Sequence, residues 1–145
     1  MKASVSLEHG MTFQGTADTG FTVQMDSRLS DGGDNSGFRP MELLLVGLGG
    51  CTAMDVISIL RKKKQEVTGL EVKLEAQQSD EHPHVFTHIT VKYIVRGHNV
   101  NEKAVARSIE LSETKYCPAQ AMFTKTATIE NTYEIFEEEE EANNG

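Results

Sequence analysis

The chain has 145 residues, of which 38% are hydrophobic and 25% charged, a composition that indicates one globular domain and excludes a disordered chain. Its 22 acidic residues outnumber its 14 basic ones, and this net charge of −8 argues against binding to nucleic-acid phosphates. The longest nearly apolar run, residues 43–54, is shorter than the about 20 residues that span a membrane, and the first residues lack the apolar stretch of a signal peptide, so we expect a cytoplasmic protein that binds no membrane.

The first forty residues predict three strands and a long loop. Apolar and polar residues alternate in three segments, at 2–8, 11–15 and 21–25, and glycine-containing turns separate these segments. The loop at 26–38 is rich in Asp, Ser, Gly and Asn. Ordered loops of this length are often functional.

Pro40 begins a predicted helix that ends in the basic run at 61–64, where cations suit the negative end of the helix dipole. The first half of this helix is apolar almost all round, which predicts a buried central helix. Gly49 and Gly50 are poor helix formers. They either allow another backbone to approach closely or break the helix just before Cys51.

The rest of the chain predicts a hairpin, two helices and a last strand. The expected segments are strands at 70–76 and 85–95, helices at 101–115 and 119–124, and a strand at 127–136. This order predicts an α+β fold with helices on one side of an antiparallel sheet. We expect one domain over residues 1–136 and a solvated tail over 137–145, because five adjacent glutamates repel one another.

The two cysteines carry the main chemical information. In a reducing cytosol Cys51 and Cys117 are not expected to form a permanent disulfide, so they are either inert core residues or a redox pair that the fold brings together. Cys51 is either a small buried hydrophobe or a thiolate near a new helix N-terminus. Cys117 precedes Pro118 at an expected N-cap, which favours its thiolate, although a cysteine merely tolerated at a helix start fits equally well.

Three histidines fall on the predicted hairpin. His82 and His84 share a strand face, and with a cysteine they would form a zinc site. Strand alternation, however, places His84, Phe86 and His88 on the face opposite the apolar set. We therefore interpret them as solvent-facing residues and expect neither a metal nor another cofactor.

Longer motifs surround the two cysteines. The first consists of residues 39–45 (RPMELLL) and 49–56 (GGCTAMDV), and the second is Ser112-x-x-Lys115-Tyr116-Cys117-Pro118. Together with the hairpin segments at 85–89 and 93–97, these motifs resemble the signatures of the OsmC/Ohr family, with the nearest likeness to its YhfA-like branch. The resemblance covers nearly the whole chain.

The resemblance implies an intertwined homodimer in which antiparallel sheets wrap two long central helices, with active sites at the dimer interface. It also implies thiol-dependent reduction of organic hydroperoxides in oxidative stress defence. In that reaction the peroxidatic Cys51 becomes a sulfenic acid, and the resolving Cys117 condenses with it to a disulfide. An external dithiol reduces the disulfide, and no metal, haem or flavin takes part.

One pair of charged residues departs from the family pattern. Organic hydroperoxide resistance proteins use an arginine from the N-terminal strands and a glutamate directly after the helix-opening proline. Here Met41 follows the proline and Glu42 comes one residue later, which turns the side chain by about 100° around the helix. Arg28 and Arg39 are the arginines that precede the helix, and we take Glu42 and Arg28 as candidate catalytic residues beside the two cysteines.

Two alternative functions remain open. The first is a non-catalytic dimer that holds an apolar ligand at its interface, which the departure in the arginine and glutamate positions favours. The second is a zinc protein that uses His82 and His84. A homodimer is expected in any case, because a helix that is apolar all round needs cover on every side and 145 residues offer little to provide it.

Overall fold

The computed structural model describes residues 1–139 and divides into two compact units. The N-terminal unit is Met1–Val46, and the C-terminal unit begins at Gly47. Residues 140–145, which belong to the predicted acidic tail, lie outside the described residues. The last strand reaches Glu137, one residue into that tail, and the Glu138 N–H donates to the carbonyl of Gly97 at 2.9 Å.

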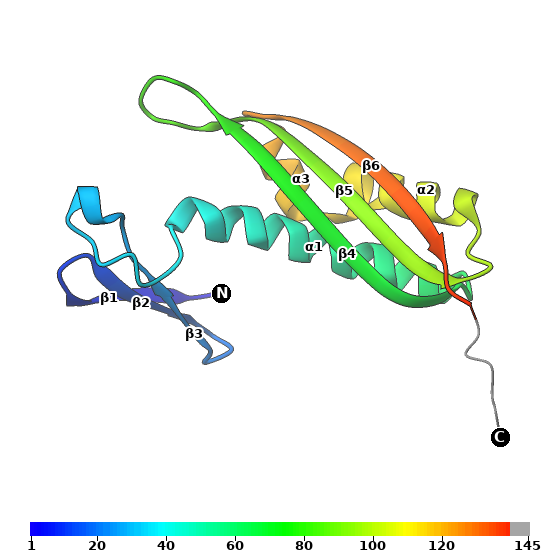
Figure 1. The fold of residues 1–145 in the computed structure, drawn as a ribbon, viewed down its shortest axis with the longest axis horizontal. Helices are drawn as coiled ribbons and strands as arrows, with labels where there is room; N and C mark the ends of the chain where they lie inside the picture. Colours follow the sequence, from blue (N-terminus) through cyan, green and yellow to red (C-terminus); the bar gives the residue numbers. More distant parts are fainter. Residues whose placement is uncertain (140–145) are drawn as a thin grey trace. The chain divides into compact units, whose positions relative to one another are not determined.

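The N-terminal unit is built on the three predicted strands. β1 (Ala3–His9), β2 (Thr12–Ala17) and β3 (Thr22–Met25) form an antiparallel sheet in the order β1-β2-β3 (Figure 1). Gly10 in the turn between β1 and β2 has a φ of +52°, a left-handed conformation that glycine adopts without a steric penalty. Local alternation and turn residues were therefore sufficient to predict this sheet.

The loop after β3 is organised by the buried carboxylate of Asp26. Five donors reach it: Ser36 Oγ (2.6 Å), Ser36 N (3.2 Å), Thr12 Oγ1 (3.0 Å), Asp34 N (3.3 Å) and Ser27 N (2.7 Å). The Ser36 hydroxyl above all, helped by the other donors and against the effect of burial, holds the pKa of Asp26 well below its usual range. This hydrogen bonding gives the long loop a structural role, because it ties the loop to β2.

The helix predicted from Pro40 is continuous. α1 (Pro40–Lys62) runs through both glycines before Cys51, so the expectation of a possible break there is wrong. Its neighbours are strong helix formers, and they outweigh a penalty of about 1 kcal/mol for each glycine. A Cβ on Gly49 would lie 2.7 Å from Leu74 Cδ1, so the close approach is made by a side chain rather than by a backbone.

α1 buries one face only. Leu48, Thr52, Val56 and Leu60 recur every four residues and are buried, whereas Met54 is 73% exposed. The expectation of a helix covered all round is therefore not met within one chain. The first half of the helix is apolar on every side, as the sequence indicates, but a single chain leaves part of this apolar surface exposed.

By length and composition alone, α1 is also apolar enough to cross a membrane, a test that the core helix of a soluble protein passes as well. Judging membrane-spanning length from the uninterrupted apolar run at 43–54 alone was too strict a criterion. The helix continues beyond that run to Lys62 with only a few polar residues, so its mean hydropathy stays at 2.0 over eighteen residues.

The C-terminal unit holds a mixed sheet in the order β4-β5-β6, formed by Glu66–Gln78, Phe86–His98 and Thr128–Glu137. β4 and β5 are antiparallel, but β6 runs parallel to β5, so the prediction of a purely antiparallel sheet is wrong. The reason is the crossover between β5 and β6, which returns the chain to the starting end of β5.

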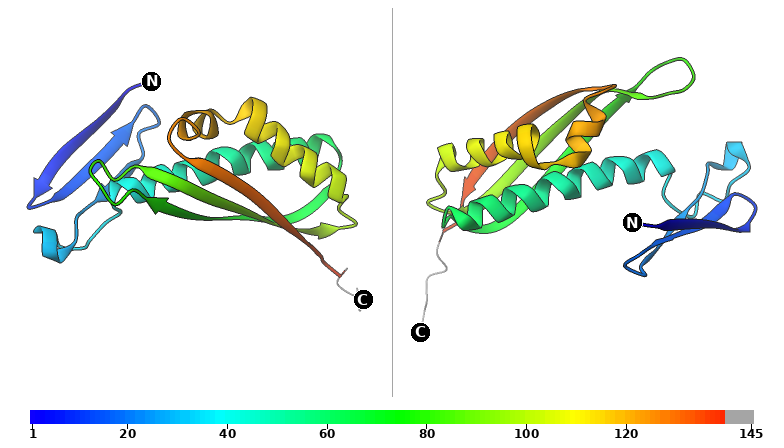
Figure 2. Two further views of the ribbon diagram at one scale, coloured as in Figure 1. Left: turned by 90° about the horizontal axis from the view of Figure 1, so that it is seen from above. Right: turned by 180° about the vertical axis from the view of Figure 1, so that it is seen from behind.

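The crossover consists of three helical segments: α2 (Glu102–Leu111), a π-helical turn (Ser112–Tyr116) and α3 (Pro118–Phe123). The predicted helix at 101–115 is thus two segments, with Asn101 as the N-cap of α2. These segments and the second half of α1 lie on one face of the sheet, as predicted (Figure 2).

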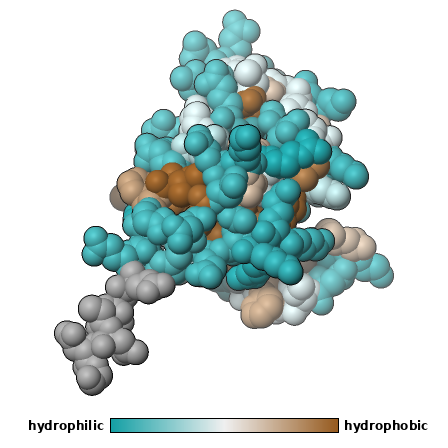
Figure 3. Space-filling view, turned by 90° about the vertical axis from the view of Figure 1, so that its right-hand side faces the viewer, coloured by the Kyte–Doolittle hydropathy of each residue, from teal (hydrophilic) through white to brown (hydrophobic). Residues whose placement is uncertain are grey.

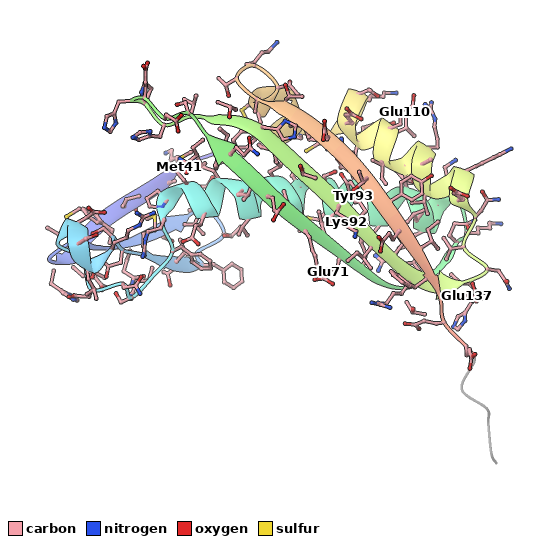
Figure 4. All side chains as sticks on the ribbon, turned by 45° about the horizontal axis from the view of Figure 1, so that its top comes forward. Met41, Glu71, Lys92, Tyr93, Glu110 and Glu137 are labelled. Carbon is pink, nitrogen blue, oxygen red and sulfur yellow. The ribbon has the colours of Figure 1, made fainter. Side chains whose placement is uncertain are left out.

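β5 contributes more residues to the core than any other element. Tyr93 is fully buried, whereas its neighbour Lys92 points to the outer face and pairs with Glu134 at 2.9 Å (Figure 4). This alternation of inward and outward side chains along β5 is the one that the sequence predicted for the second strand of the hairpin. Hydrophilic side chains cover most of the surface visible in Figure 3.

The start of β5 departs from that alternation. A register shift opposite Gln77 and Gln78 adds one residue to β5, so Phe86 points inward and packs on Phe123 with ring centroids 5.9 Å apart. The prediction of a solvent-facing Phe86 is therefore wrong. His88 does lie on the outer face, where it pairs with Glu130 at 3.4 Å.

Gly97 on β5 has no room for a side chain, because an added Cβ would lie 2.1 Å from the Glu66 carbonyl oxygen. We expect Gly97→Ala to lower the free energy of unfolding by about 3 kcal/mol, measured by urea denaturation. The matched control is Gly69→Ala on β4, where the added Cβ would meet only the Arg96 side chain at 3.7 Å. That variant should change stability by no more than about 0.5 kcal/mol. Equal losses in the two variants would contradict this steric explanation.

Candidate active site

The structure places both cysteines in the C-terminal unit, with free thiols. Cys51 is half-buried in the middle of α1, and Cys117 is 3% exposed. The predicted N-cap is confirmed: Cys117 precedes α3 with Pro118 at its first position, and Cys117 Sγ accepts a hydrogen bond from the Gln120 N–H at 3.3 Å. The local sequence was sufficient to place this sulfur at the start of a helix.

The N-cap lowers the pKa of Cys117 as predicted, but burial outweighs it. Burial raises the pKa of the Cys117 thiol to about 11, and the neighbouring Cys51 thiol raises it further, whereas the Gln120 N–H lowers it. One backbone donor at the start of a six-residue helix does not compensate for the loss of solvent around the sulfur. Cys117 is therefore a protonated thiol at neutral pH.

The same contributions show that the two sulfurs are neighbours. The Cys51 thiol lies close enough to Cys117 to raise its pKa. Two cysteines on separate helical segments are thus brought together by the packing of α3 against the face of α1. Of the two open interpretations, this arrangement favours a redox pair over two unrelated core residues.

A buried hydrogen-bond network lies next to the cysteine pair. Thr52, which follows Cys51, is its centre, because the Thr52 hydroxyl has three partners from three other segments. They are Tyr93 OH (2.6 Å), Ser112 Oγ (2.8 Å) and Gln120 Nε2 (3.1 Å). Ser112 also donates to Asp55 Oδ2 at 2.9 Å, so the network extends to a carboxylate one helical turn after Cys51.

Tyr93 belongs to the surroundings of Cys117. Burial raises the pKa of the Tyr93 phenol to about 12, the Thr52 hydrogen bond opposes this shift, and a charge on Cys117 adds to it. The phenol is therefore protonated throughout the physiological range. It is close enough to the buried sulfur for the charge of one group to affect the other.

A pocket of about 380 Å3 lies beside both cysteine segments. It includes Asp55, one turn after Cys51, and Tyr116, which directly precedes Cys117. The other lining residues are Ser58, Ile59, Lys62, Lys63 and Leu111. The pocket gives the outer end of the network, at Asp55, access to solvent and to small molecules.

The two predicted charged residues lie in the N-terminal unit. Glu42 Oε1 accepts a hydrogen bond from the Arg39 N–H at 2.8 Å, so this carboxylate caps the start of α1. The exposed Arg28 side chain makes no hydrogen bond or ion pair with any other residue among 1–139. A catalytic role for Arg28 and Glu42 stays a prediction.

Sequence reasoning missed the network residues. Thr52, Asp55 and Ser112 occur in the two cysteine motifs, and this was the only available signal that they lie near the site. Tyr93 has the pattern of an ordinary core residue on a strand, and Gln120 has that of a surface residue on a short helix. Only the packing of α1, β5 and α3 reveals that their polar atoms meet.

The hypothesis of a zinc site needs at least one ligand besides His82 and His84. The rings of His82 and His84 are neighbours, with centroids 4.2 Å apart. Among residues 1–139, no group of three or more His, Cys, Asp or Glu side chains could hold a metal ion.

Comparisons with known proteins agree with the resemblance read from the cysteine motifs. Residues 33–132 match the sequence model of the OsmC-like protein family. The chain is 40% identical to protein YhfA of Escherichia coli K12 over 135 residues, which cover 93% of this chain and 98% of YhfA.

Solved structures show the same fold. A hypothetical protein from Aquifex aeolicus has 32% identity and a TM-score of 0.84, with 95% of this chain and 97% of that one covered. An organic hydroperoxide resistance protein OsmC from Legionella pneumophila has a TM-score of 0.66, with coverage of 91% and 94%, and its identity of 15% shows a common fold alone. Given the family match over most of its length and the 40% identity to YhfA, the chain belongs to the OsmC family.

Proposed function

We propose that this protein is a thiol-dependent peroxidase that reduces organic hydroperoxides in oxidative stress defence. The supporting observation is the pair of neighbouring thiols, one half-buried and one buried, in a chain of the OsmC family. The difference in exposure suits two distinct roles. A peroxide can reach Cys51, whereas Cys117 is reached from within the protein.

In the first step the Cys51 thiolate attacks the terminal oxygen of the hydroperoxide. An S–O bond forms, the O–O bond breaks, and the leaving alkoxide takes a proton and departs as an alcohol. Cys51 is oxidised to a sulfenic acid, and the peroxide is reduced.

In the second step Cys117 attacks the sulfur of the Cys51 sulfenic acid. An S–S bond forms, the S–O bond breaks, and the leaving hydroxide becomes water with the proton that Cys117 gives up. The nucleophile in this step is the Cys117 thiolate, so Cys117, whose pKa is raised by burial, must give up its proton as the S–S bond forms.

In the third step an external dithiol restores the enzyme. Its thiolate attacks the disulfide, its second thiol completes the exchange, and it leaves as a disulfide while both cysteines return to thiols. The proposal needs no metal or organic cofactor. Arg28 and Glu42 are proposed as further catalytic residues.

The proposal includes a cytoplasmic homodimer. Met54 and other apolar residues on α1 are exposed in one chain, and a second copy is the proposed cover for this face. A reducing cytoplasm would also supply the dithiol that the third step consumes.

The test is one equivalent of cumene hydroperoxide added to the reduced protein, followed by intact-mass and peptide analysis without reductant. The expected result is the rapid loss of two hydrogens and a crosslinked peptide pair containing Cys51 and Cys117. Incubation without peroxide is the control for oxidation by air. Two unreacted thiols after long exposure would contradict the peroxidase.

A second candidate function, non-catalytic binding of an apolar ligand, is favoured by a pocket in the N-terminal unit. This pocket of about 390 Å3 is lined mainly by apolar residues, which are Val5, Met11, Phe13, Met25 and Pro40. Unreacted thiols together with saturable binding of a hydrophobic fluorescent probe would support this function instead.

A further inference from the structure

Gln120 on α3 is hydrogen-bonded to both cysteine segments. It is fully buried, which is true of no other residue of α3. Its backbone N–H donates to Cys117 Sγ at 3.3 Å, and its side-chain Nε2 donates to Thr52 Oγ1 at 3.1 Å. Thr52 directly follows Cys51 on α1, a continuous helix of 23 residues. Gln120 therefore holds the sulfur of one cysteine in a fixed place relative to the helix that carries the other.

The position of α3 depends on contacts of this kind. α3 has six residues, too few for a helix that is stable without tertiary contacts. At its far end Phe123 packs on Phe86 of β5, with ring centroids 5.9 Å apart. In its first turn, next to Cys117, Gln120 makes the hydrogen bond to Thr52. Phe123 thus ties α3 to the sheet, whereas Gln120 ties the end that carries Cys117 to α1.

Stability alone does not explain a glutamine at this buried position. Its Oε1 is buried and meets no hydrogen-bond donor among residues 1–139. An unpaired buried carbonyl destabilises a folded protein at least as much as one ordinary hydrogen bond stabilises it. The Thr52 hydroxyl does not need the glutamine either, since Tyr93 and Ser112 are its other partners. What a polar side chain adds here is direction, because a hydrogen bond fixes the orientation of α3 on α1 more narrowly than an apolar contact does.

We propose that Gln120 is a positioning residue for the Cys51–Cys117 pair: its two hydrogen bonds hold the start of α3 against α1, so that the two sulfurs stay within reach of each other for disulfide formation. The inference rests on the proposed function for this one step, and the step can be driven without peroxide. The two protein thiols lose their hydrogens as the S–S bond forms. An oxidised dithiol takes up both hydrogens as its own disulfide is reduced to two thiols.

The test is the equilibrium of the protein with oxidised and reduced dithiothreitol. Gln120→Met keeps the size of the side chain and removes its donor. The reduced variant then samples arrangements in which the sulfurs lie apart, whereas the disulfide excludes these arrangements. The equilibrium constant for oxidation of the two thiols should therefore fall about fivefold, the effect of one hydrogen bond. It is measured by acid quenching and intact-mass analysis at a series of dithiothreitol ratios.

Urea denaturation of the reduced protein separates positioning from general support of the fold. Gln120→Met loses one hydrogen bond together with one unpaired carbonyl, so its unfolding midpoint should stay within about 0.3 M of the wild-type value. The matched control is Phe123→Leu, which weakens the other end of α3. This variant should lower the midpoint by about 0.5 M and change the dithiothreitol equilibrium constant by less than about a factor of two.

Gln120→Leu is a second variant with the same expectations, and it replaces the methionine variant if circular dichroism shows that the latter is unfolded. An equilibrium constant equal to that of the wild type would overturn the inference. A lower constant with a loss of stability as large as that of Phe123→Leu would also overturn it, because Gln120 would then only support the fold.

Failure of this inference can be told apart from failure of the peroxidase. If the wild-type disulfide forms with dithiothreitol and Gln120→Met has the same equilibrium constant, the inference alone is overturned. If dithiothreitol gives the expected results but cumene hydroperoxide leaves both thiols intact, the inference is supported and the peroxidase alone is contradicted. A wild-type protein that forms no Cys51–Cys117 disulfide at any dithiothreitol ratio would overturn both.

Discussion

Cys51→Ser should abolish hydroperoxide reduction and leave only the rate measured without protein. A serine hydroxyl is not oxidised by a peroxide under these conditions, and Cys117 does not replace Cys51, since it is 3% exposed and its pKa is about 11. The measurement is peroxide consumption in the presence of a dithiol, followed with an excess of cumene hydroperoxide.

Cys117→Ser is the matched control, because it removes the other cysteine and leaves Cys51 in α1. In the absence of a dithiol, this variant should consume one equivalent of peroxide per chain and retain a sulfenic acid that dimedone labels. Turnover by the Cys51→Ser variant at the wild-type rate would remove Cys51 from the mechanism. Absence of dimedone labelling in Cys117→Ser would remove the sulfenic acid intermediate.

Met54→Glu should divide the proposed dimer into single chains. Met54 is 73% exposed in the middle of α1, and at a dimer interface a glutamate there would be a buried charge without a partner. Light scattering coupled to size exclusion should give twice the chain mass of 16.0 kDa for the wild type and a single chain mass for the variant.

Gln78→Glu adds the same charge at an exposed position of β4 and should leave the dimer intact. A wild-type mass of one chain would contradict the dimer directly. An unchanged mass in Met54→Glu would place the interface away from the middle of α1.

The sequence predicted those parts of the fold that depend on local signals. Alternation and turn residues were enough for β1 to β3, and Pro40 and Pro118 marked the starts of two helices that the structure confirms. The OsmC resemblance, carried by the motifs around Cys51 and Cys117, is confirmed by the comparisons. In each case the signal lies within a few neighbouring residues.

Features that depend on tertiary packing were not predicted. Alternation has a period but no direction, so the segment that forms β6 could not reveal that it runs parallel to β5. The bulge that turns Phe86 inward depends on pairing with β4. The acidity of Cys117 depends on how much solvent the surrounding elements exclude, and an N-cap motif does not contain this information.

In the candidate active site, too, local motifs predict some features and tertiary packing determines the others. Both cysteines could be found from their motifs, but the network that joins Thr52 to Tyr93, Ser112 and Gln120 is assembled from four different segments. Each of these residues has an ordinary explanation within its own segment. Their common location is a property of the fold and not of any motif.

The parallel pairing of β5 and β6 also has a consequence for synthesis. β5 contributes more core residues than any other element, yet its second edge is closed only when β6 pairs with it, from His88 with Thr128 to Gly97 with Glu137. On the ribosome, the central strand therefore has one open edge until β6 has emerged, and open edges of this kind invite pairing with other chains. We expect this long-range closure to slow folding.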